Sequence, residues 1–110
     1  GWIPYMLGRL NREASWRKSE VPLLEKSPEE HIRESFYFGT QPLEEPNDPS
    51  HIDQALRMVG ADNLLFASDY PHWDFDNPES IHSRFRSAFS AEEREKILWK
   101  NAAEAYGIDV

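Results

Sequence analysis

The sequence predicts an α/β fold, and three observations carry that prediction. Two short apolar or aromatic runs, residues 36–38 and 64–67, each stop abruptly, as buried strands do. Between the runs, apolar residues recur at the i, i+3, i+4 and i+7 spacing of an amphipathic helix. Capping signals mark further helices on both sides of this segment. Strand, helix and strand in this order predict a βαβ unit, whose two strands are parallel.

The N-terminal third carries two helical signals. Apolar residues at helical spacing, with a proline near the start, predict a short amphipathic helix over residues 4–16. Residues 27–30, Ser-Pro-Glu-Glu, form a capping box, which predicts a second helix running to about Glu34. The charged residues 17–25 are expected to connect the two helices.

The first strand is predicted near residues 36–40, where an aromatic run meets Gly39 and Thr40. Residues 41–50 then hold three prolines and the three acids Glu44, Glu45 and Asp48, so they cannot form regular structure. We expect a long loop here, and loops of this kind often form the rim or lid of a site.

The second strand is predicted near residues 64–69, after a helix that starts at Asp48-Pro49 and ends at Gly60. Closing helices are predicted over residues 78–106, from a start at Asn77-Pro78 and a second capping box at residues 90–93. The residues expected to face inward are Ile81, Phe85, Ala88 and Phe89, and in the last helix Leu98, Ala102, Ala105 and Tyr106.

Two strands are too few for a self-sufficient parallel sheet, which needs both faces covered. A (β/α)8 TIM barrel takes about 250 residues, so we expect residues 1–110 to be a C-terminal fragment with about the last two βα units of one. The missing strands would then be absent or supplied by another chain. Exposed strand edges predict a homo-oligomer, or association with the remainder of the barrel.

Composition excludes several classes of function. The chain has 20 acidic and 12 basic residues, a net charge of -8, which argues against nucleic acid or an anionic membrane as a partner. No apolar run approaches the roughly 18 residues that span a bilayer. Without cysteine, a metal must be held by oxygen or imidazole nitrogen. We expect a cytoplasmic protein that acts on a small-molecule substrate.

The best candidate for chemistry is Asp69. It follows an apolar strand directly, and barrel enzymes place their reactive groups at the carboxyl ends of such strands. The loop after it, residues 70–76, is dense in titratable and aromatic side chains. In the alternative interpretation Asp69 caps a turn, and the aromatic residues only pack over the strand end.

Residues 64–74, Leu-Leu-Phe-Ala-Ser-Asp-Tyr-Pro-His-Trp-Asp, closely resemble the eighth strand and following loop of the amidohydrolase-related family, in its aminocarboxymuconate-semialdehyde decarboxylase-like branch. The resemblance covers essentially the whole chain. Residues 36–42 resemble strand seven and its loop, residues 52–60 resemble helix seven, and residues 101–107 resemble the closing helix of the family.

The resemblance implies that Asp69 ligates a divalent metal, typically zinc, and accepts a proton from metal-bound water. The family's other ligands, a His-x-His pair and two further histidines, follow strands that this sequence does not contain. His72 then acts beside Asp69 or faces the substrate, with plain loop packing as the alternative. Trp73 and Asp74 line the pocket or pin the loop. The other histidines, His31, His51 and His82, are expected at the surface.

The resemblance therefore implies part of a metal-dependent enzyme that hydrolyses or non-oxidatively decarboxylates a small carboxylated or cyclic substrate. The isolated 110-residue chain is expected to be inactive, because most of the metal ligands are missing from it. The alternative hypothesis is a stand-alone, non-catalytic module that self-associates or docks on a partner protein.

Overall fold

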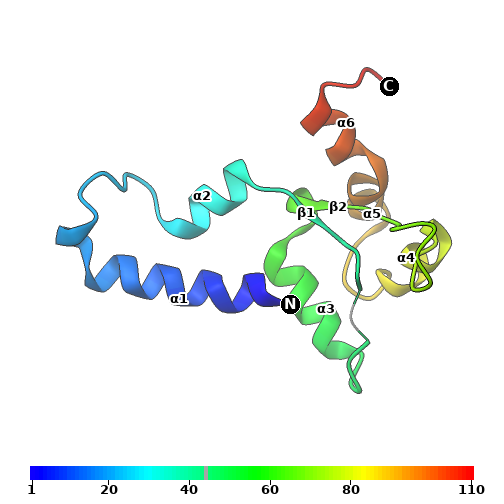
Figure 1. Cartoon of the computed structure of the whole chain (residues 1–110), viewed down its shortest axis with the longest axis horizontal. Coiled ribbons are helices and arrows are strands. Elements are labelled where there is room, and N and C mark those ends of the chain that lie inside the picture. The colour runs from blue at the N-terminus through cyan, green and yellow to red at the C-terminus, as the bar shows by residue number, and fades with distance from the viewer. Residues whose placement is uncertain (44) are drawn as a thin grey trace. The chain divides into compact units, whose positions relative to one another are not determined.

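The computed structural model describes residues 1–43 and 45–110, without the side chain of Ser80. Glu44, one of the acids of the predicted long loop, lies outside the described residues. The chain divides into two compact units, Gly1–Phe36 and Tyr37–Val110 (Figure 1). No helix in the described part of the chain is both long enough and apolar enough to cross a bilayer.

The first unit contains the two predicted helices. Helix α1 spans Trp2–Trp16, the short helix η1 spans Lys18–Glu20, and α2 spans Pro28–Ser35. The predicted capping box at the start of α2 is present: the Glu30 N–H donates to Ser27 Oγ, and the Ser27 N–H donates to the Glu30 carboxylate. Asn11 of α1 holds the first turn of α2, because its side chain exchanges two hydrogen bonds with Glu29.

The second unit contains the predicted βαβ arrangement. Strand β1, Phe38–Gly39, pairs in parallel with β2, Leu64–Leu65, and Phe38 lies opposite Leu64. Helix α3, Ser50–Val59, and the short helix η2, Ala61–Asn63, connect the two strands. In Figure 1 the helices of this unit are arranged about the strand pair. The predicted parallel pairing of the two strands is confirmed.

The ladder is shorter than the strands predicted near residues 36–40 and 64–69. Past its end, the Thr40 N–H still donates to the Leu65 carbonyl at 2.9 Å, but the Ala67 N–H donates to Thr40 Oγ1 at 3.1 Å. The Phe66 N–H donates to the Ile97 carbonyl at 2.8 Å. Beyond β2, the Thr40 side chain and the last helix therefore provide the backbone hydrogen bonds that a neighbouring strand would provide in a longer ladder.

The core of this unit follows the predicted helical faces. Leu56 and Val59 of α3 are buried, and Gly60 ends the helix with φ at 91°, a value that favours glycine. Helix α4 spans Pro78–Arg84, and Ile81 and Phe85 are fully buried. The ring of Phe89 meets that of Phe85 edge to face at a centroid distance of 6.0 Å.

The last helix buries a different set of residues from the set predicted. It consists of α5, Ala91–Glu95, a π-helical turn η3, Lys96–Lys100, and α6, Asn101–Tyr106. Its buried residues are Ile97, Asn101 and Ala103, whereas the predicted inward residues Ala105 and Tyr106 are exposed. The predicted phase was wrong because the wider π turn rotates the residues after it relative to a regular helix.

Asn101 joins this helix to the strand. Its side chain is buried, and its amide donates to the carbonyls of Ala61 at 2.7 Å and Leu64 at 2.8 Å. The neighbouring π turn presents the Ile97 carbonyl to Phe66. The last helix therefore holds β2 from its approach at residue 61 to its exit at residue 66.

Replacing Asn101 with leucine should strongly destabilise the chain. The side chain is close in size, but the Leu64 carbonyl loses its Asn101 donor and the Ala61 carbonyl keeps only the Leu64 N–H, at a cost of about 1–3 kcal/mol in the free energy of unfolding. Urea unfolding followed by circular dichroism measures the loss. The matched control, Asn47→Leu, changes an exposed residue and should cost under about 0.5 kcal/mol. An equal effect of the two substitutions would contradict the role of Asn101.

The second predicted capping box, at the start of α5, should make stability depend on pH. The backbone N–H and then the hydroxyl of Ser90 lower the pKa of Glu93 below its ordinary value of 4.5. A carboxyl whose pKa is lower in the folded state stabilises above its unfolded pKa and loses this contribution as pH falls through the folded pKa. Between pH 6 and 3, Glu93→Gln should therefore lose less stability than the parent chain. Parallel curves for the two proteins would contradict this prediction.

Candidate metal centre

Asp69 lies just beyond the carboxyl end of β2, where the backbone turns sharply. Its φ is 56°, a left-handed conformation that aspartate tolerates better than most residues but that still costs energy. The His72 N–H donates to the Asp69 carbonyl at 2.9 Å, which closes the turn. Strained residues of this kind cluster at functional sites, so the conformation itself singles out Asp69.

The turn brings Asp69, His72 and Asp74 together. One possible ligand atom from each side chain lies within 4.8 Å of the other two. His72 Nδ1 is 3.1 Å from Asp69 Oδ2, a hydrogen-bonding distance at which a protonated Nδ1 donates to the carboxylate. All three residues are exposed, and the side chain of Asp69 keeps half of its surface open.

The donor set suits a divalent metal. Carboxylate oxygens and an imidazole nitrogen are ligands that zinc accepts, and two such ligands around one tetrahedral ion lie about 3.4 Å apart. The 3.1 Å between Asp69 and His72 is close to this spacing. The three residues together, or Asp69 with His72 as its hydrogen-bonding neighbour, therefore fit such an ion, and the exposure leaves room for further ligands.

The loop that carries these residues is fixed at several points. At its far end the Asp76 N–H donates to the Ser68 carbonyl at 2.9 Å, so the loop returns to the residue before Asp69. The rings of Tyr70 and Phe75 meet edge to face at 5.6 Å. Gln41 Nε2 donates to the Asp74 carbonyl at 2.6 Å. The loop after β2 is thus tied to itself and to the loop after β1.

The remaining predicted residues lie outside this cluster. Trp73 is almost fully exposed, at 94% of its surface, and borders a cavity between the two loops. His51 and His82 are exposed and His31 is partly exposed. His51 Nε2 lies 3.7 Å from Asp48 Oδ2, and His82 Nδ1 accepts a hydrogen bond from Arg94.

Sequence reasoning missed an ion-pair group that links both loops. Arg84 of α4 pairs with Glu45 of the first loop and, at 3.6 Å, with Asp76 of the second. Arg84 is exposed and also borders two cavities. The signal was available: Arg84 lies three residues after the core residue Ile81 and directly before Phe85, which places it near the buried face of the helix.

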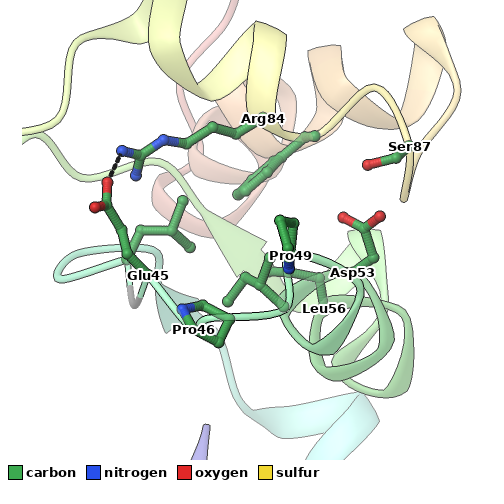
Figure 2. Close-up of a pocket in the computed structure, with 10 residues that line it drawn as sticks. Glu45, Pro46, Pro49, Asp53, Leu56, Arg84 and Ser87 are labelled. Carbon is green, nitrogen blue, oxygen red and sulfur yellow. Dashed lines mark hydrogen bonds and ion pairs between the residues drawn. The ribbon is translucent and has the colours of Figure 1, made fainter.

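The two cavities flank Arg84. One, of about 330 Å³, lies between the two loops and is bordered by Gln41, Glu45, Trp73, Asp74 and Asp76. The other, of about 290 Å³, is mainly apolar and is walled by Pro49, Leu56 and Phe85, with the Arg84–Glu45 pair on one side (Figure 2). Arg84 is the one cationic residue among the described residues that border either cavity.

Comparison with known proteins identifies the family. The family model described as Amidohydrolase matches residues 2–108, almost the whole chain. A gamma-resorcylate decarboxylase from Polaromonas sp. (strain JS666 / ATCC BAA-500) is 29% identical over 116 residues, which cover 97% of this chain and 32% of that relative. The chain thus spans about a third of the length of this curated relative. By its sequence over residues 2–108, the chain belongs to the amidohydrolase family.

Proposed function

We propose that the chain is the C-terminal part of a (β/α)8 barrel, and that the complete barrel is a metal-dependent enzyme in which Asp69 is a metal ligand and proton acceptor. The observation that carries the proposal is the position of Asp69. It lies in a left-handed turn at the carboxyl end of a parallel strand, with His72 Nδ1 at 3.1 Å and Asp74 close by.

The barrel part of the proposal rests on the incomplete sheet. Two strands with a two-residue ladder present unpaired edges, which further parallel strands would satisfy. The match to the family, and a relative about three times as long, support a barrel whose other strands lie outside this chain. The partner of this chain would therefore be the remainder of the barrel, alone or in a homo-oligomer.

Asp69 and His72 would have different roles at the metal. A bound divalent ion such as zinc would supply Lewis acidity and keep a nearby carboxylate ionised. A proton on His72 Nδ1 holds Asp69 Oδ2 and fixes the rotamer of the carboxylate. Asp69 Oδ1 is then the atom that ligates or accepts a proton. The open turn gives a small substrate access to this oxygen.

The reaction proposed is non-oxidative decarboxylation of a small cyclic carboxylate, with hydrolysis as the alternative within the family. The relative that is 29% identical is named a gamma-resorcylate decarboxylase, which supports decarboxylation. Either reaction needs a group at Asp69 that gives or takes a proton beside a metal. Gamma-resorcylate is therefore the first compound to test.

Replacing Asp69 with asparagine in the complete protein should remove metal and activity together. The amide keeps the shape of the side chain but loses its charge and its basicity, so turnover should fall by about 10²–10⁴-fold. Metal content by mass spectrometry and decarboxylation of gamma-resorcylate measure the two effects. Asp109→Asn, at an exposed residue near the C-terminus, is the control and should leave both unchanged. Full metal content and turnover in Asp69→Asn would overturn the assignment.

His72 should affect metal affinity more weakly than Asp69. Without the imidazole the Asp69 carboxylate loses a hydrogen bond that orients it, so zinc should bind about 10–100-fold more weakly to His72→Ala. Competition with a chelator measures the dissociation constant. His82→Ala removes an exposed imidazole from α4 and serves as the matched control. Equal zinc affinity in the two variants would show that His72 only packs in its loop.

A further inference from the structure

We propose that Arg84 binds the carboxylate group of the substrate, and that Glu45 occupies the guanidinium until the substrate displaces it. This inference rests on the proposed function, because it assigns a subsite to the same active site. It goes beyond that function in naming the cation that recognises the substrate and the internal group that competes with it.

The charges of the two loops favour Arg84 as the carboxylate-binding group. The loops after β1 and β2 hold the carboxylates of Glu45, Asp48, Asp69, Asp74 and Asp76, and no described residue of these two loops is a lysine or an arginine. An anionic substrate entering between them meets a negative surface. Arg84 contacts both loops, and it is the one cation among the described residues that border the adjoining cavities. Recognition of a carboxylate by this part of the protein therefore falls to Arg84.

The two partners of Arg84 differ in their exposure to solvent. The Asp76 side chain is only 9% exposed, and its backbone N–H is fixed to the Ser68 carbonyl. Its Oδ2 atom is buried and has no hydrogen-bond partner within the described part of the chain. A buried carboxylate in this state needs the nearby positive charge. Asp76 is therefore a permanent partner that positions the guanidinium.

Glu45 is the exchangeable partner. Its side chain is 75% exposed, so its ion pair with Arg84 is bathed in water and contributes little to stability. Figure 2 shows this pair at the edge of the apolar cavity, with the carboxylate reaching the guanidinium from the loop. A guanidinium has five N–H donors in a planar fork, which suits a second carboxylate in place of Glu45. The exchange replaces one negative charge with another.

The location of Arg84 also suits a carboxylate subsite. The cavity of about 330 Å³ is bordered by both Arg84 and Asp74, and Asp74 belongs to the Asp69 cluster. The cavity also contacts the aromatic side chains of Trp73 and Phe75. A small ring that carries a carboxylate can therefore meet the guanidinium, an aromatic wall and the edge of the candidate metal centre within one space.

The experiment measures binding of benzoate to the complete protein by titration calorimetry, without turnover. Arg84→Gln should weaken benzoate binding at least about tenfold, because a charged hydrogen-bond donor is lost. Glu45→Gln should tighten binding about three- to tenfold, because the site no longer has to release an internal carboxylate. Arg86→Gln, at an exposed arginine two residues away, is the control. Benzyl alcohol, a probe without a carboxylate, should bind all four proteins equally.

The sign of the Glu45→Gln effect decides the proposal. Weaker benzoate binding in that variant would show that the pair is a structural latch and would overturn the proposal, as would parent protein that binds no benzoate. Should Arg84→Gln fail to fold, as judged by circular dichroism, Glu45→Gln alone gives the answer. Failure of the proposed function looks different, because metal content or turnover would be absent while benzoate binding kept its dependence on both residues.

Discussion

The hydrogen bonds between the last helix and β2 are the constraint on which the site depends. The buried amide of Asn101 binds the carbonyls of Ala61 and Leu64, and the Ile97 carbonyl accepts the Phe66 N–H. A two-residue strand ladder could not hold this segment by itself. Because the helix supplies these bonds, β2 has a fixed direction where it ends. The position of Asp69 follows from that direction.

Hydrogen bonds also fix the backbone of the loop that follows β2. Thr40 is buried, and its Oγ1 atom accepts the Ala67 N–H, so the end of β1 fixes the backbone two residues before Asp69. The Ser68 carbonyl then receives the Asp76 N–H and closes the loop that carries His72 and Asp74. The first bond joins residues 27 positions apart, and the second joins the two ends of one loop. Hydrogen bonds to the backbone therefore hold the turn and the loop that carry Asp69, His72 and Asp74.

Much of this arrangement could be predicted from the sequence. Both capping boxes, the face of Ile81 and Phe85, the stop at Gly60 and the parallel strand pair follow from local patterns, and the structure contains them. Asp69 became the candidate ligand because an apolar run ends just before it and because residues 64–74 resemble the amidohydrolase-related family. The phase of the last helix was missed because a π turn has no signature in hydrophobic periodicity.

The ion pairs of Arg84 were missed for a different reason. They join residues 39 and 8 positions apart, and such contacts depend on how loops fold back over a helix. Local spacing carries no information of that kind. The helical spacing from Ile81 indicates that Arg84 lies near the core, but it does not indicate which residues Arg84 pairs with. The sequence thus predicts the strand end at which we propose the active site, but not the charges that surround it.

The most direct test of the central claim is a crystal structure of the complete protein with zinc, with the ion located by anomalous scattering. The account predicts a zinc ion about 2.0–2.2 Å from a carboxylate oxygen of Asp69, with His72 either on the ion or hydrogen-bonded to that carboxylate. A zinc ion bound elsewhere, with Asp69 engaged only in its turn, would contradict it.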